Sequence, residues 1–157
     1  MIEREDIYEL NELSKVIKFE NIPFKNLMDA FSGFICDVLI ANDSFQNLNI
    51  DSKTETVIIN YALQGKAFLD KSINNTALEK ARISAWKTHD GFVGGSAAKN
   101  LLRIVICSLY DEDAAEYDTQ GSEMPGVIFS LLLDLGKGYC KQFRYYLQEN
   151  LVPWDDM

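Results

Sequence analysis

The clearest pattern in the chain is an apolar stripe at helical spacing between positions 24 and 39. The apolar residues there recur at i, i+3, i+4 and i+7, as expected for a helix that buries one face. They are Phe24, Leu27, Met28, Phe31, Ile35, Val38 and Leu39. A shorter amphipathic helix is predicted from about Ile7 to Ile17, and Pro23 favours the first turn of the longer helix. Two helices are therefore expected to open the fold.

Two capping patterns predict helices in the middle of the chain. Ser52 and Glu55 have the S/T-x-x-E spacing, in which each side chain satisfies an otherwise unpaired amide at a helix start. The helix that they begin is expected to run to about Lys71. Thr76 and Glu79 repeat the signature after a turn-prone pair of asparagines, so a fourth helix is expected there.

A fifth helix is predicted after Ser96, which is a good N-cap residue. This helix is apolar on nearly all sides and is therefore expected to be central. Its single cation is Arg103, and a largely buried guanidinium needs a carboxylate or carbonyl partner. We expect a structural ion pair between Arg103 and either Asp37 or Asp134.

The remaining pattern is also helical. Pro125 suits the first turn of a final segment whose apolar residues continue at helical spacing, and Gly136 and Gly138 are expected to kink or divide it. No run of alternating residues bounded by hairpin signals is convincing, so the predicted class is all-α. Without an internal repeat or a low-complexity linker, we expect residues 1–157 to form a single helical domain, a compact bundle of about six or seven helices.

Composition and charge exclude several functions. The 24 Asp and Glu residues outnumber the 15 Lys and Arg residues, for a net charge of −9. Such a charge repels phosphate backbones and anionic lipid heads, so direct binding to nucleic acid or membranes is not expected. The N-terminus lacks the features of a secretory signal, and the longest apolar stretch, residues 126–133, is too short to span a bilayer. We expect a soluble, cytoplasmic protein.

No set of residues completes a catalytic, metal or cofactor constellation. His89 is the only histidine, so a multi-histidine metal site cannot be built, and no other imidazole could serve as the base for a nucleophilic Ser or Cys. It is expected to end a helix, where the dipole favours it. Cys36, Cys107 and Cys140 are odd in number and set among apolar residues, so buried reduced thiols are expected. The glycines between positions 91 and 95 lack the preceding strand of a phosphate-binding loop. No cofactor is expected.

One helical strip carries an aromatic residue with charged neighbours. Arg82, Trp86 and Asp90 lie at four-residue intervals along one helical strip. The strip could form a surface with an aromatic centre. Alternatively, Trp86 packs into the core while Arg82 pairs with Glu79, which is the more common arrangement for an aromatic residue at helical spacing.

The charge imbalance is concentrated between Arg103 and Lys137, where no other Lys or Arg occurs. The carboxylates in this gap are those of Asp111, Glu112, Asp113, Glu116, Asp118, Glu123 and Asp134. Tyrosines interleave with them, so the segment predicts an acidic surface with aromatic anchors, which suits a basic protein partner. The residues expected to bind that partner are Tyr110, Asp111, Glu112, Asp113, Glu116, Tyr117 and Asp118.

A purely structural explanation of the acidic segment remains open. Asp111, Glu112 and Asp113 follow the fifth helix, where the negative end of its dipole disfavours carboxylates by ~0.3–1 kcal/mol each. Alternatively, Asp113 and Glu116 begin a short helix through a capping-box-like pattern, and the other carboxylates are only solvated. The segment lacks the ligand pattern of a calcium-binding loop.

Part of the chain resembles a known group of proteins. The residues concerned are Arg82, Trp86 and Asp90, followed by Arg103 and by Ile106-Cys107-Ser108-Leu109-Tyr110-Asp111. They resemble small all-helical bacterial immunity proteins, which neutralise toxins delivered by contact-dependent inhibition or type VI secretion. The resemblance implies a small, soluble, cytoplasmic protein, often acidic, that needs no catalysis.

Three functions are therefore weighed. The first is an immunity protein that occludes the active site of a basic toxin domain, plausibly a nuclease whose cleft accepts carboxylates in place of phosphate. The second is a helical adaptor or regulatory subunit that binds an endogenous basic protein through the same surface. The third is an enzyme in which Asp37 and Asp134 converge in the bundle core and bind a metal ion.

Overall fold

The computed structural model describes residues 4–41, 48–92, 96–118 and 124–151. Within these ranges the regular structure is entirely helical, which confirms the predicted all-α class. The α-helices are α1 (Glu5–Ser14), α2 (Phe24–Phe34), α4 (Ser52–Leu69), α5 (Asn75–Asp90), α6 (Ala97–Cys107), α7 (Glu112–Asp118), α8 (Met124–Leu135) and α9 (Tyr139–Leu151). A 3₁₀ turn, η1 (Phe19–Asn21), precedes α2, and a π-helical segment, η2 (Ile35–Ile40), follows it.

The described residues contain eight α-helices rather than the predicted six or seven. One additional helix is α7, which lies within the acidic connection. The other arises because the final predicted segment is two helices, α8 and α9, separated at Gly136 and Gly138 as the sequence indicated. Gly138 has a φ of 95°, in the left-handed region that glycine adopts without a Cβ penalty.

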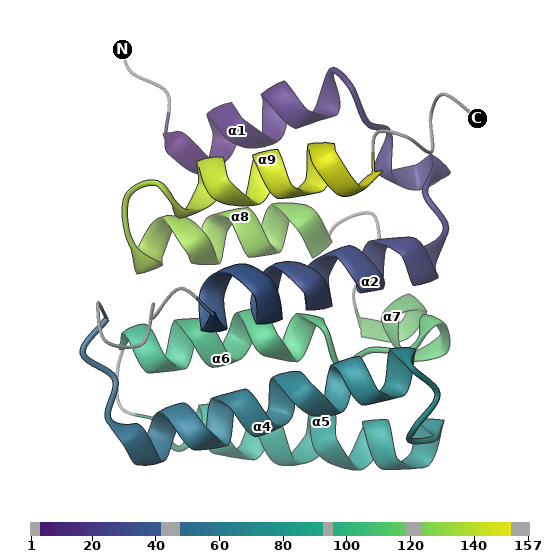
Figure 1. Cartoon of the computed structure of the whole chain (residues 1–157), viewed down its shortest axis with the longest axis vertical. Coiled ribbons are helices and arrows are strands. Elements are labelled where there is room, and N and C mark those ends of the chain that lie inside the picture. Colours follow the sequence, from purple (N-terminus) through teal and green to yellow (C-terminus); the bar gives the residue numbers. More distant parts are fainter. Residues whose placement is uncertain (1–3, 42–47, 93–95, 119–123, 152–157) are drawn as a thin grey trace.

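Helix α6 lies at the centre of the arrangement. It packs against α4, α5 and α8, while α2 packs against α4 and α9. In Figure 1, α4 and α5 form one end of the molecule, α1, α8 and α9 form the other, and α2 and α6 lie between them. The side chains from Leu101 to Ile106 in α6 are at most 1% exposed, except that of Arg103. The predicted central position of this helix is therefore confirmed.

An aromatic cluster joins three of the helices. The ring of Phe143 in α9 lies 4.8 Å from that of Phe34 in α2 and 4.9 Å from that of Phe129 in α8, measured between centroids. All three rings are at most 1% exposed. Removing one such ring from a packed core typically costs about 3–5 kcal/mol, so this cluster fixes α9 against α2 and α8.

The helix starts at α4 and α5 differ from the predicted capping boxes. Asp51 caps α4 by accepting a 2.8 Å hydrogen bond from the Thr54 amide, and Asn74 caps α5 by accepting 2.9 Å from the Ala77 amide. The predictions of Ser52 and Thr76 as caps are therefore wrong by one and two residues, because the short polar side chain just upstream reaches the free amides instead. The predicted cap Ser96 is confirmed at α6, where its hydroxyl accepts from the Lys99 amide at 3.2 Å.

Helix α2 approaches α9 closely at Gly33. A Cβ at this position would collide with the hydroxyl of Tyr146. That hydroxyl also donates a hydrogen bond to Asp37 in η2. Burial, with the neighbouring Asp37 carboxylate as a further cause, raises the pKa of Tyr146 above its ordinary value. A larger side chain at position 33 would therefore displace the Tyr146 hydroxyl from its place beside Asp37.

Polar contacts attach α1 to the end of the bundle. The Glu5 carboxylate accepts a 3.0 Å hydrogen bond from the backbone amide of Gly138, which lies between α8 and α9. One turn later, Glu9 is buried and forms an ion pair with Arg144 of α9. A buried carboxylate requires such a partner, so the acidic residues of α1 have a structural role.

The longest helix, α4, has 18 residues and includes charged side chains at Lys53, Glu55 and Lys66. Among the described helices, none combines the length and apolar composition that a bilayer span requires.

Candidate functional site

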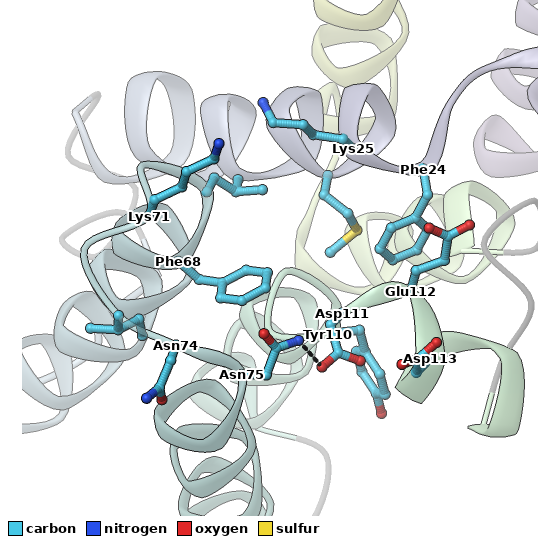
Figure 2. Close-up of a pocket in the computed structure, with 13 residues that line it drawn as sticks. Phe24, Lys25, Phe68, Lys71, Asn74, Asn75, Tyr110, Asp111, Glu112 and Asp113 are labelled. Atoms are coloured by element: carbon cyan, nitrogen blue, oxygen red, sulfur yellow. Dashed lines mark hydrogen bonds between the residues drawn. The ribbon is translucent and has the colours of Figure 1, made fainter.

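A groove opens between the start of α2, the turn from α4 to α5 and the start of α7. Its volume is about 640 Å³, within the range of 300–1,000 Å³ typical of ligand sites. The apolar lining comes from Phe24, Met28, Phe68, Leu69, Ile73 and Tyr110. Figure 2 shows Lys25 and Lys71 along one side of the groove, whereas Asp111 and Asp113 lie on another side. The groove therefore has an apolar floor and charged edges of both signs.

Four of the seven residues predicted to bind a partner line this groove. They are Tyr110, Asp111, Glu112 and Asp113. Glu116, Tyr117 and Asp118 belong to the helical backbone of α7, and their side chains lie outside the described part of the structure. The acidic segment is thus brought beside residues from α2 and from the α4–α5 turn, which are distant in sequence.

Asp111 has a positioning role at this site. One carboxylate oxygen accepts a 2.8 Å hydrogen bond from the Ala114 amide, and the other accepts 2.9 Å from the side-chain amide of Asn75 (Figure 2). Partial burial alone would raise the pKa of Asp111. The two hydrogen bonds and the nearby Arg82 lower it by more, so the pKa lies below its ordinary value. Asp111 therefore caps α7, and the predicted start at Asp113 and Glu116 is wrong.

Glu112 and Asp113 are groove carboxylates that make no hydrogen bond or ion pair through their side chains with the residues that the structure describes. Both are exposed and stand in the first turn of α7. From the sequence alone, both follow the negative end of the fifth predicted helix, whose dipole would disfavour them. In the structure the positive end of the α7 dipole favours them instead, because a new helix starts at Glu112. Local helix stability therefore accounts for part of the acidic composition, as in the structural alternative of the sequence analysis, although the cap is Asp111.

Tyr110 lies behind the carboxylates, as predicted, and is only 7% exposed. The guanidinium of Arg82 stands 4.9 Å from the centre of its ring and donates a 3.0 Å hydrogen bond to the Leu109 carbonyl. The predicted pairing of Arg82 with Glu79 is wrong, because the guanidinium turns toward the segment that leads into α7. Arg82 thus supports the floor of the groove from behind.

Lys71 is a groove residue that sequence reasoning missed as a functional candidate. It follows α4 with a φ of 65°, in the left-handed region that is costly for residues with a Cβ. Its amide bonds to the Phe68 carbonyl at 3.0 Å, and the Ser72 amide bonds to the Ala67 carbonyl at 2.8 Å. This pair of bonds defines a Schellman motif, in which Lys71 occupies the position that glycine usually fills. Placing lysine rather than glycine in this left-handed conformation costs on the order of 1 kcal/mol of stability. A role in folding therefore does not explain the lysine.

The helical strip that carries Trp86 does not line the groove. The Arg103 side chain is exposed, and its guanidinium lies 5.3 Å from the ring centre of Trp86, which is half-buried against the core. The ring of Trp86 also contacts that of His89 at 5.2 Å. The predicted ion pair of Arg103 with Asp37 or Asp134 is therefore wrong, because Arg103 occupies the narrow exposed strip of α6. Trp86 packs against the core, as in the second alternative, and the cation at its ring is Arg103 rather than the predicted neighbour Arg82.

The proposed carboxylate metal site is not formed. Asp37 and Asp134 are both exposed and do not converge in the bundle core. Among the described residues, no cluster of three or more His, Cys, Asp or Glu side chains could hold a metal ion. His89 lies in the last turn of α5 and forms a 3.0 Å contact with the adjacent Asp90 carboxylate. The geometry therefore offers no support for the metal-enzyme hypothesis within the described part of the chain.

The three thiols are largely packed. Cys107 and Cys140 are buried, and burial raises the pKa of each to about 12. The Cys140 thiol also donates a 3.2 Å hydrogen bond to the Phe129 carbonyl. Cys36 is half-buried, and burial raises its pKa as well. The predicted packing role is confirmed for Cys107 and Cys140. The weak glycine motif at positions 91–95 lies partly outside the described residues, at 93–95.

Comparison of the chain with protein-family models, with curated proteins and with solved structures gave no match.

Proposed function

We propose that this chain binds a basic protein at the groove and acts as an immunity protein that inhibits an antibacterial toxin. The observation that carries this proposal is the position of Glu112 and Asp113, which are exposed at the edge of an apolar groove of about 640 Å³. Exposed carboxylates attract and orient a basic partner, while adjacent apolar surface supplies contact area that loses water on binding. The two features together favour a protein interface.

Inhibition in this proposal is stoichiometric occlusion. Lysine or arginine side chains of the toxin's active-site cleft pair with Glu112 and Asp113, and an adjoining toxin residue enters the groove. A nuclease domain is the favoured target because its cleft is basic, so the carboxylates take the place of phosphates. This mechanism requires no catalytic residue or cofactor, and it would operate in the bacterial cytoplasm.

A helical adaptor is the second candidate, and one observation favours it. Lys25 and Lys71 also border the groove, so its rim is not uniformly acidic. An endogenous partner with both positive and negative side chains would be complementary in charge to this rim. A toxin cleft with only positive side chains would be complementary only to the α7 side. The adaptor and the immunity protein use the same surface and differ in the identity of the partner.

Affinity co-purification from the native host separates these candidates. The tagged protein is captured at low and high salt, and bound proteins are identified by mass spectrometry. The immunity proposal predicts a 1:1 complex with a basic toxin domain that dissociates at high salt and whose activity falls in proportion to added protein. A 1:1 complex with an endogenous regulatory protein would favour the adaptor. A toxin domain that keeps full activity in the complex would contradict occlusion.

A further inference from the structure

The lysine side of the groove has chemistry that the proposed function does not use. Lys71 is exposed, and its ammonium group makes no hydrogen bond or ion pair with the residues that the structure describes. Within the described part of the chain, the ammonium group of Lys25 makes one ion pair, an exposed one with Asp29, at 3.1 Å and one helical turn away. Exposed pairs of this kind are weak and exchange readily with other anions. Two cations are thus free to meet a ligand.

The apolar floor lies beside these cations. Phe24 and Phe68 are half-buried, and both line the same groove as Lys25 and Lys71. Figure 2 shows the Phe68 ring between the lysine side and the side formed by Asp111. A ligand whose apolar group rests on this floor would therefore place an adjacent anionic group near the two ammonium groups.

The backbone at Lys71 supports a role outside folding. A glycine would relieve the left-handed conformation, and a helix end of this type is normally glycine. A lysine held in this conformation directs its side chain from the α4–α5 turn along the groove (Figure 2). Glycine would suit the backbone here but would lack the positive charge of Lys71, which a binding role would require.

We propose that the groove binds a segment of the partner protein in which an apolar side chain is followed by Glu or Asp. The apolar side chain occupies the floor at Phe24 and Phe68, and the carboxylate pairs with Lys25 and Lys71. This inference deepens the proposed function and rests on it, because it names the part of the partner that enters the groove while Glu112 and Asp113 meet the partner's cations.

Two capped dipeptides test the inference without the partner. The probes are N-acetyl-Phe-Glu-amide and N-acetyl-Phe-Gln-amide, which differ only in one charge. Each is titrated into ¹⁵N-labelled protein, and binding is followed through backbone amide shifts. The inference predicts shifts at Lys25, Phe68 and Lys71, and affinity for the Glu probe at least about threefold higher than for the Gln probe, as expected for exposed ion pairs.

Two glycine variants provide the matched comparison. Lys71→Gly removes the ammonium group from a position where glycine suits the backbone, so lost binding cannot be attributed to unfolding. Asn49→Gly changes the other described non-glycine residue with positive φ, at 58°, and Asn49 does not line the groove. The preference for the Glu probe should fall in Lys71→Gly, where only Lys25 is left to pair with the carboxylate, and should be unchanged in Asn49→Gly.

Three results would contradict the inference. Equal affinity of the wild-type protein for the two probes, a preference of unchanged size in Lys71→Gly, or no shifts at the groove residues up to the solubility limit would each overturn the inference. The probes contain no toxin or host protein, so this result is independent of partner capture. A failure of the proposed function would appear in the co-purification instead.

Discussion

Asn75 donates a 2.9 Å hydrogen bond from its side-chain amide to the carboxylate of Asp111, and so joins the start of α5 to the start of α7. The second oxygen of the same carboxylate caps α7 through the Ala114 amide. One side chain therefore sets the position of the helix that carries Glu112 and Asp113. The geometry of the acidic side of the groove depends on this bond.

Replacing Asp111 with alanine should destabilise the protein by about 1 kcal/mol, because α7 loses its cap and Asn75 loses its acceptor. The free energy of unfolding is measured by urea denaturation. Asp113→Ala is the matched control, since its exposed side chain does not cap the helix, and its effect should be about half as large or less. Equal effects of the two substitutions would show that Asp111 has no special structural role.

The contribution of Asp111 should also depend on pH. Its pKa is lowered from the ordinary 3.8 in the folded protein, so the charged form stabilises the fold. This stability is fully present above pH 3.8 and is lost as the pH falls below that value through the folded pKa. The stability difference between wild type and Asp111→Asn should be constant near neutrality and shrink in this acidic range. Asp6 and Asp51, whose pKa values are also lowered, are shared by both proteins and cancel. A difference that stays constant down to pH 2 would contradict the assignment.

Lys71→Gly should stabilise the protein by about 0.5–1 kcal/mol. Relief of the left-handed backbone outweighs the greater flexibility of glycine in the unfolded chain. For a chain of this size, such a gain raises the melting temperature by about 2–4 °C per kcal/mol, which scanning calorimetry detects. Asn49→Gly should produce a smaller gain, because asparagine tolerates the left-handed region better than lysine. A lower melting temperature for Lys71→Gly would mean that the lysine side chain contributes to folding.

The native thiols should react slowly with Ellman's reagent at pH 8. Cys107 and Cys140 are buried with pKa values raised to about 12, so they should react only when the protein unfolds. Half-buried Cys36 should react first, and Cys36→Ser should remove this early phase. Rapid reaction of all three thiols in the native protein would show that the core opens far more readily than its packing indicates.

Sequence periodicity predicted the elements with strong apolar patterns. The stripe that begins at Phe24 became α2, and the apolar run after Ser96 became the central helix α6. Caps were predicted less well, because Asp51 and Ser52 are adjacent and both suit an N-cap. Only the local geometry decides which side chain reaches the free amides.

The groove itself could not be predicted from the sequence. Its walls come from α2, the α4–α5 turn and α7, and periodicity does not encode which helices pair. Arg103 illustrates the same limit, since an apolar helix still leaves one narrow strip exposed, and its direction depends on the neighbouring helices. The sequence does contain a signal for Lys71. A helix end favours glycine, and no glycine follows α4 at that position.

The central claim is that a basic partner binds at the α7 side of the groove, and titration calorimetry with the co-purified partner tests it most directly. Glu112→Lys/Asp113→Lys is compared with Asp134→Lys/Glu149→Lys, which changes the net charge equally at exposed positions that do not line the groove. We predict a Kd at least about tenfold higher for the first variant, or 1.4 kcal/mol, and about twofold or less for the second. Equal effects of the two variants, or an unchanged Kd for the first, would contradict the proposed interface.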